Sequence, residues 1–236
     1  MPYRRLPRTD TARLKTLKTL LDNDGIYTAR NRFIDWKTLN RARPLYDRLL
    51  TASEQYKVCY NAQVRNSSKI EVLQKRATMY VSHFLQVLFM TVDRGEIRRQ
   101  VLAVYGMPDD AKTLPNLNTL EGLCEWAEKT IAGEKQRIRQ GGRPIYNPTI
   151  GMVATHYDIF REAYQAQRVL QERTNKALEE TKAIRPEVDE VILDLWNQIE
   201  AHYANLPAEQ RFVAATKLGV IYYNRKNEHY IFTNDD

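Results

Sequence analysis

The four histidines are the first candidates for metal chemistry in this 236-residue chain. Helical bundles often bind iron through Glu-x-x-His pairs, whose side chains share one helix face. Here the third residue before each histidine is Tyr80, Val153, Ile199 or Lys226. His202 and Glu200 are only two positions apart, so in a helix they point in different directions. We therefore predict no metal site, and we interpret His83, in the most apolar segment, as a hydrogen-bonded core residue.

The sequence also lacks the motifs of nucleophilic catalysis and of phosphate transfer. Cys59 and Cys124 have no histidine nearby in sequence, and the chain lacks the G-x-S-x-G motif of serine hydrolases. Gly141 and Gly142 lack the other glycines of G-x-G-x-x-G, and no Walker-type lysine follows Gly133. We expect a protein that is not an enzyme and that holds no cofactor. Two isolated cysteines, and an N-terminus without an apolar signal core, favour the cytoplasm.

Basic charge is the strongest functional signal. The chain opens with MPYRRLPR, and residues 1–48 carry twelve Lys or Arg against five Asp or Glu, whereas residues 49–236 carry 24 of each. Clustered positive charge favours binding to nucleic acid or to an acidic protein surface, and an arginine arm can follow a phosphate backbone. The alternative is a solvated basic end. The candidate binding residues are Arg4, Arg5, Arg8, Arg13, Lys15, Lys18, Arg30, Arg32, Lys37, Arg41 and Arg43.

Tyrosines offer a second signal, because the chain has fourteen of them. Tyr46, Tyr56, Tyr157 and Tyr164 fall on apolar stripes where leucine would be usual. One interpretation is amphipathic packing, in which the hydroxyl reaches water or a neighbouring group. The other is an aromatic platform on which bases stack beside arginines.

The elements that would position these residues are mainly helices. Thr9 or Asp10 can cap a first helix that stops at Gly25. Apolar residues then recur every three or four positions from residue 36 to residue 64, which predicts a long helix with Pro44 as a candidate restart point.

The middle of the chain predicts three more helices. Ser68 and Glu71 have the spacing of a capping box, so we expect a break and a new helix there. The uncharged run 77–92 is too short to span a membrane and predicts a buried central helix. A short helix over 93–107, a connector over 107–118 and a helix over 119–140 complete this part.

A linker, GGRPIYNPT, separates the two halves of the chain. A long helix follows from Val153, with a polar second half, and Pro186 suits the first position of a further helix. After a short helix, two β-rich runs flank residues 224–227, which predicts a terminal β-hairpin.

The predicted fold is mainly α: an elongated bundle of two long helical hairpins with a small C-terminal β-hairpin. Its parts are a basic arm (1–8), a first helical half (9–140), a linker (141–148), a second helical half (149–218), and the hairpin and tail (219–236), with the halves packed as one domain. In both halves an Ile-Tyr pair precedes the long helix, and the last short helix ends at a glycine that lies ten residues after a glutamate. This is either an internal duplication or a coincidence among helical hairpins.

The opening PYRRLPRTDTARLKTLK and the closing LGVIYYNRKNE resemble a family of bacterial proteins that share an arginine-proline start and a tyrosine-rich end. The resemblance implies a bacterial cytoplasmic protein and no particular activity.

These patterns favour a non-catalytic interaction protein whose basic N-terminal region binds nucleic acid or an acidic partner, with no membrane contact. One alternative is an oligomeric scaffold that associates through the polar half of the 153–182 helix. Another is a small-molecule-binding or enzymatic bundle with a site near Tyr80, His83 and Trp196.

Overall fold

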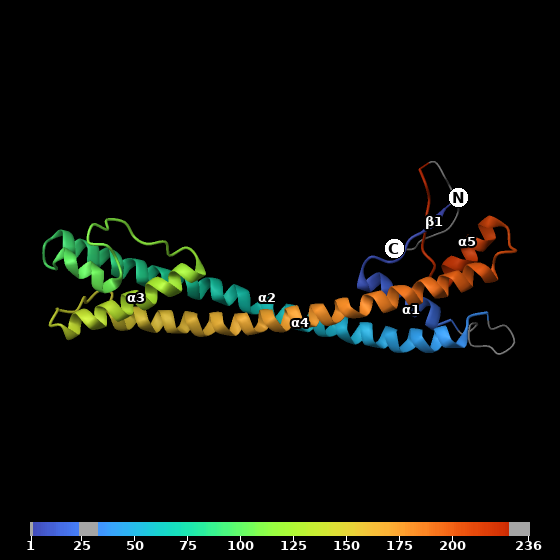
Figure 1. Cartoon of the computed structure of the whole chain (residues 1–236), viewed down its shortest axis with the longest axis horizontal. Coiled ribbons are helices and arrows are strands. Elements are labelled where there is room, and N and C mark those ends of the chain that lie inside the picture. The colour runs from blue at the N-terminus through green and yellow to red at the C-terminus, as the bar shows by residue number, and fades with distance from the viewer. Residues whose placement is uncertain (1, 24–32, 227–236) are drawn as a thin grey trace. The chain divides into compact units, whose positions relative to one another are not determined.

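The structure, a computed structural model, describes residues 2–23 and 33–226 and is mainly α (Figure 1). Its elements are β1 (Tyr3–Arg4), α1 (Asp10–Leu21), α2 (Trp36–Asp93), the 3₁₀ helix η2 (Arg99–Tyr105), α3 (Leu120–Arg139), α4 (Ile150–His202), α5 (Ala208–Lys217) and β2 (Tyr222–Tyr223). The mainly helical class is therefore confirmed.

Helix α1 begins where its sequence predicts. The Thr9 hydroxyl accepts a hydrogen bond from the amide of Ala12, which satisfies one of the free amides at the helix start. Its buried face is formed by Leu17, Leu20 and Leu21. The predicted stop at Gly25 lies outside the described residues.

Helix α2 is continuous, so the predicted break at Ser68 is wrong. The Ser68 hydroxyl donates to the carbonyl of Arg65 instead of capping a new helix, and Glu71 pairs with Lys75 one turn further on. The helix also continues through Pro44, which is exposed near its N-terminal end. Because the exposed Asn40 precedes Pro44 by one turn, water can satisfy the carbonyl that proline leaves without a partner.

Helix α4 is continuous through Pro186, so the prediction of a new helix starting there is wrong as well. Pro186 is exposed, and the carbonyl that it leaves without a partner belongs to the exposed Lys182. Ile184 and Val188 on either side are buried in one core. Their packing offsets a local cost of about 3 kcal/mol for an interior proline.

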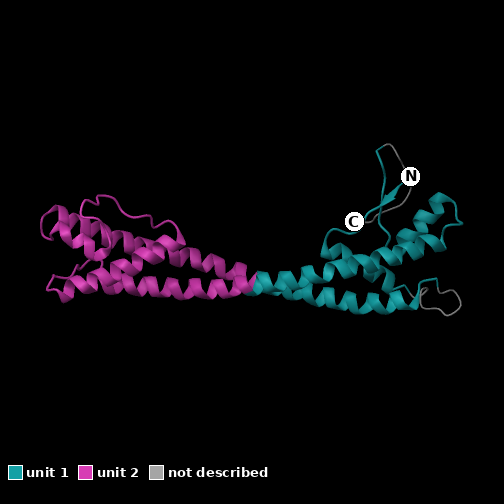
Figure 2. Ribbon diagram, in the orientation of Figure 1, with its two compact units in different colours: residues 1–60, 173–236 teal, residues 61–172 magenta. Residues whose placement is uncertain are grey.

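The chain forms two compact units, each with its own apolar core (Figure 2). Unit 1 comprises residues 1–60 and 173–236, and unit 2 comprises residues 61–172. The linker 141–148 lies inside unit 2, between α3 and α4. An internal duplication of the halves 9–140 and 149–218 stays a prediction.

In unit 1, α1 and the N-terminal part of α2 pack against the C-terminal part of α4. The core contains Leu17, Leu49, Val191 and Trp196, each at most 1% exposed. Helix α5 and the following segment close this core through Phe212 and other apolar residues. Gly219 lies against α1 with a φ of +86°, and a Cβ there would come within 2.9 Å of the Thr16 carbonyl oxygen. Glycine is therefore required at this position both for its backbone conformation and for the close approach.

Unit 2 contains a buried ion pair that the sequence analysis missed. Glu134 of α3 is fully buried and accepts hydrogen bonds from Arg137 at 2.8 Å, from the Tyr105 hydroxyl and from the Ile145 amide. Arg137 also donates to the carbonyl of Arg143. The network joins α3, η2 and the linker. Gly133 makes room for it, because a Cβ there would lie 2.6 Å from the Tyr105 ring.

The buried face of α3 is apolar over only part of its length. Leu123 and Ala127 are buried, but Ile138 is exposed, and Glu134 and Arg137 are buried toward the end of the helix. Glu134 lies seven residues after Ala127, two turns along the same face, so an acidic residue on that face was the available signal.

Strands β1 and β2 pair in a small antiparallel sheet. Tyr3 pairs with Tyr223 and Arg4 pairs with Tyr222. The C-terminal β-strand is thus present at residues 222–223, and within the described residues its partner is the N-terminal arm. The second strand of the predicted hairpin follows residue 227 and lies outside the described residues.

Candidate nucleic-acid interface

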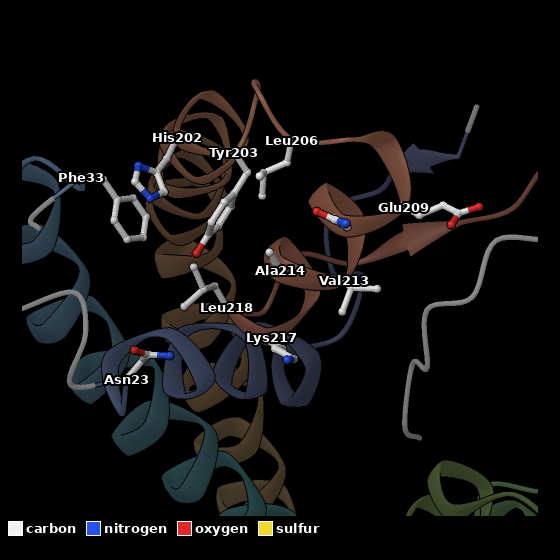
Figure 3. A pocket seen from close by; sticks show the side chains of 11 residues that line it. Asn23, Phe33, His202, Tyr203, Leu206, Glu209, Val213, Ala214, Lys217 and Leu218 are labelled. Atoms are coloured by element: carbon white, nitrogen blue, oxygen red, sulfur yellow. The ribbon is translucent and has the colours of Figure 1, made fainter.

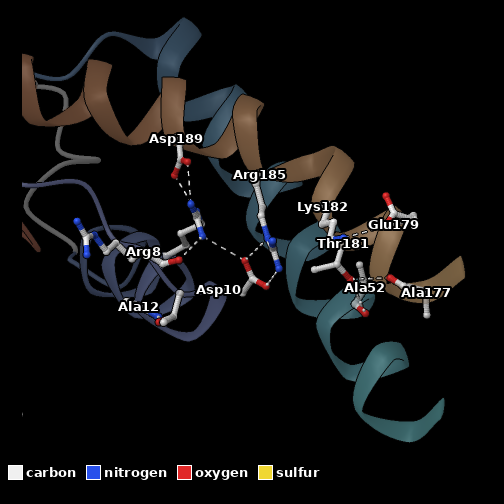
Figure 4. A network of polar contacts seen from close by, with 12 residues as sticks. Arg8, Asp10, Ala12, Ala52, Ala177, Glu179, Thr181, Lys182, Arg185 and Asp189 are labelled. Atoms are coloured by element: carbon white, nitrogen blue, oxygen red, sulfur yellow. Dashed lines mark hydrogen bonds and ion pairs between the residues drawn. The ribbon is translucent and has the colours of Figure 1, made fainter. Parts of the chain in front are cut away.

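The acidic part of α4 neutralises several of the arginines in the basic N-terminal region. Arg13 is buried and donates from Nε and Nη2 to the two carboxylate oxygens of Asp189, at 2.7 and 2.8 Å. These hydrogen bonds raise the pKa of Arg13. Arg185 of α4 donates to both carboxylate oxygens of Asp10 at 2.9 and 2.8 Å (Figure 4). Arg13 therefore fixes α1 to α4 and is a structural residue.

Arg4 is held in the same way. Its guanidinium donates to Glu200 at 2.9 Å and to the side chain of Asn197. The Tyr222 hydroxyl donates to the same carboxylate at 2.7 Å, and burial and this bond raise the pKa of Tyr222. The N-terminal arm is thus fixed to unit 1 by a strand pairing and an ion pair.

Two further arginines form exposed pairs between α2 and α4. Arg41 lies 3.2 Å from Glu190, and Arg48 lies 3.3 Å from Glu187. All four side chains are more than 40% exposed, and such pairs contribute about 0–1 kcal/mol to stability. Arg41 and Arg48 therefore remain able to exchange a carboxylate for another anion.

The other candidate residues differ in exposure. Arg8, Lys15, Lys18, Lys37 and Arg43 are exposed, and Arg5 is half-buried while its amide donates to the carbonyl of Ile221. Arg30 and Arg32 lie outside the described residues.

The fold also redistributes the charge between the units. By sequence, unit 1 carries 21 Lys or Arg against 17 Asp or Glu, and unit 2 carries 15 against 12. The excess of residues 1–48 is reduced because unit 1 brings the acidic part of α4 against them. The cations that matter for binding are those that this pairing leaves at the surface.

The small sheet presents an aromatic surface that sequence reasoning missed. The rings of Tyr3 and Tyr223 lie with centroids 6.0 Å apart and planes inclined by 31°, and the two residues are 44% and 43% exposed. By contrast, Tyr157 is buried and donates to Glu128 at 2.8 Å, and Tyr46, Tyr56 and Tyr164 are half-buried, as packing requires. The sequence carried no local signal for this pair, because each strand has only two residues and the strands come from opposite ends of the described chain.

Unit 1 also contains an open pocket of about 950 Å³ between the ends of α1, α4 and α5 (Figure 3). Phe33 and His202 are stacked in its wall with centroids 4.1 Å apart, and Tyr203 lies beside them. Lys217 and Glu209 add one charge of each sign. The pocket has the size of small-molecule sites. It is not the site predicted near Tyr80, His83 and Trp196, whose first two members belong to unit 2 and whose third belongs to the core of unit 1.

In the described part of the chain, no three His, Cys, Asp or Glu residues are placed to hold a metal ion. His83 is exposed, so its interpretation as a core residue is wrong: the apolar run 77–92 buries one face, and His83 lies on the other. Burial raises the pKa of the Cys124 thiol, which disfavours the nucleophilic thiolate.

Among the residues that the structure describes, no helix is both long and apolar enough to cross a membrane.

No protein-family model matches this chain, and neither a curated protein nor a solved structure matches it.

Proposed function

We propose that this chain is a non-catalytic interaction protein whose basic N-terminal region, within unit 1, binds nucleic acid. The observation that supports the proposal is the set of cations at the surface of unit 1. Arg8, Lys18 and Lys37 are exposed, whereas Arg4 and Arg13 are occupied by carboxylates of α4. Phosphate contacts of this kind release condensed counterions, so the binding weakens steeply with salt.

Substitution is a sharper test than deletion of the arm. Removing residues 1–8 would also remove β1 and the Arg4–Glu200 ion pair, and would therefore disturb unit 1 itself. Replacing Arg8, Lys18 and Lys37 together with alanine removes three exposed charges and leaves those contacts in place.

The measurement is the affinity for labelled DNA and RNA over a salt series. The triple variant should lower the slope of log Kd against log salt concentration by about three, because each lost phosphate contact changes it by about one. The matched control replaces three exposed cations of unit 2, Lys112, Lys135 and Arg139, with alanine and should leave the slope nearly unchanged.

Equal losses in both triple variants would contradict an interface in unit 1. Binding to polyglutamate without binding to either nucleic acid would replace the proposal with an acidic protein partner.

A further inference from the structure

The two-stranded sheet of β1 and β2 has two chemically different faces. Arg4 and Tyr222 point inward, where both bind Glu200. Tyr3 and Tyr223 form the neighbouring cross-strand pair, and successive side chains of a strand alternate between faces. Their exposed fractions of 44% and 43% place both rings at the surface.

Contacts on the inner face fix the position of this short sheet and therefore of the two outward tyrosines. Tyr222 is 2% exposed, its ring packs edge-on against Phe212 with centroids 4.9 Å apart, and its hydroxyl donates to Glu200. Arg4 donates to the same carboxylate. The outward tyrosines are thus supported by a buried tyrosine and an ion pair, although each strand has only two residues.

Cations flank the tyrosine pair at both ends. Because the strands are antiparallel, Arg5 follows Tyr3 and Arg4 at one end of the sheet, and Arg225 and Lys226 follow Tyr223 at the other. The side chains of Arg225 and Lys226 are exposed, and that of Arg5 is half-buried. An extended polyanion that crosses the pair would meet positive charge on both sides.

We infer that Tyr3 and Tyr223 form a stacking platform for single-stranded nucleic acid, with Arg5, Arg225 and Lys226 contacting its phosphates. Exposed aromatic side chains on strands bind unpaired bases in this way, because every base has a ring face that can stack. In a duplex these faces are already stacked on neighbouring base pairs. The carboxylates of an acidic protein surface would pair with the cations, but they have no ring faces to stack on the two tyrosines.

This inference rests on the proposed function and adds its ligand class. The test measures fluorescence anisotropy of a labelled, unstructured 15-nucleotide DNA, the RNA of the same sequence, and a 15-base-pair duplex. The variants are Tyr3→Ala alone and Tyr3→Ala with Tyr223→Ala. A third variant, Tyr3→Phe with Tyr223→Phe, keeps both rings, and Tyr146→Ala removes a 78% exposed tyrosine from unit 2 as a control.

Loss of a stacked base should weaken single-strand binding by at least about fivefold per tyrosine. Duplex affinity should stay within about twofold, and the phenylalanine variant and Tyr146→Ala should bind single strands as the unaltered protein does. The variant Tyr3→Ala keeps the test valid if the double alanine variant unfolds the sheet, because Tyr3 is exposed near the chain end.

Three outcomes would overturn the platform. One is unchanged single-strand binding by the alanine variants, and another is an equal loss for single strands and duplex. The third is a loss in the phenylalanine variant as large as in the alanine variant. In each of these cases salt-dependent binding would persist, and the proposed function would stand without the platform. Absence of binding to any of the three nucleic acids would refute both.

Discussion

Replacing Glu134 with alanine is expected to lower the free energy of unfolding by about 3–5 kcal/mol. Glu134 is fully buried, and Arg137, its partner at 2.8 Å, is only 6% exposed. The substitution leaves the Arg137 guanidinium buried with two neutral acceptors, the carbonyl of Arg143 and the Tyr105 hydroxyl. It also removes the acceptor of the Tyr105 hydroxyl and of the Ile145 amide. An unpaired buried charge is the dominant cost, because removing one partner of such a pair leaves the other desolvated.

The same residue predicts a pH dependence. Burial disfavours the ionised form of Glu134, but hydrogen bonds from Arg137, Tyr105 and the Ile145 amide outweigh this and lower its pKa. A carboxyl group whose pKa is lower in the folded state stabilises the fold above its unfolded pKa of 4.5, and this stabilisation is lost as the pH falls through the folded pKa. The stability difference between the unaltered protein and Glu134→Ala should therefore shrink below about pH 4.5.

The assay is urea unfolding followed by circular dichroism at pH 7 and at pH 3.5, with hydrogen exchange of α3 amides to locate the change. The control is Glu125→Ala on the same helix, which removes an exposed pair with Lys129 and should cost about 0.5 kcal/mol or less. A loss below about 1 kcal/mol for Glu134→Ala at pH 7 would refute the reasoning. A stability difference that stays constant down to pH 3.5 would refute the assignment of the ionised form.

Two further predictions concern backbone space and the Arg13 contact. Gly133→Ala should destabilise the protein by about 1–3 kcal/mol, because its Cβ would overlap the Tyr105 ring at 2.6 Å, whereas Gly151→Ala, in open helical space, should be neutral or stabilising by up to about 1 kcal/mol. Thermal unfolding compares the pair, and equal effects would contradict the packing argument. Arg13→Ala should cost at least about 2 kcal/mol, because Asp189 loses a bidentate partner, while Arg41→Ala should cost about 1 kcal/mol or less. Urea unfolding measures both, and similar losses would show that burial of the Arg13 pair is unimportant.

Local patterns in the sequence determined the helical class and several element ends. Thr9 caps α1, Thr119 begins α3 by accepting from the Gly122 amide, and Gly106 and Gly141 follow η2 and α3 with positive φ. These features depend on residues within one or two helical turns, so that spacing and side-chain type are enough to predict them.

Local patterns misled where tertiary packing outweighed them. Ser68 and Pro186 have the chemistry of helix starts, yet α2 and α4 pass through both. A capping box stabilises a helix end by about 1 kcal/mol, whereas each buried leucine, valine or isoleucine contributes about 1.5–3 kcal/mol. The apolar faces around these positions therefore decide that the helices continue.

In the candidate interface, too, some features follow from the local sequence and others only from the tertiary structure. The sequence by itself located the positive charge in the first 48 residues and excluded the usual catalytic motifs. Only the tertiary structure decided which charges are occupied and which surface is aromatic, because Arg4 meets Glu200 and Tyr3 meets Tyr223 across about two hundred residues. The spacing of residues within a helix or strand cannot predict contacts between such distant parts of the sequence. They follow from the folding of α4 against α1, which brings β1 and β2 together in unit 1.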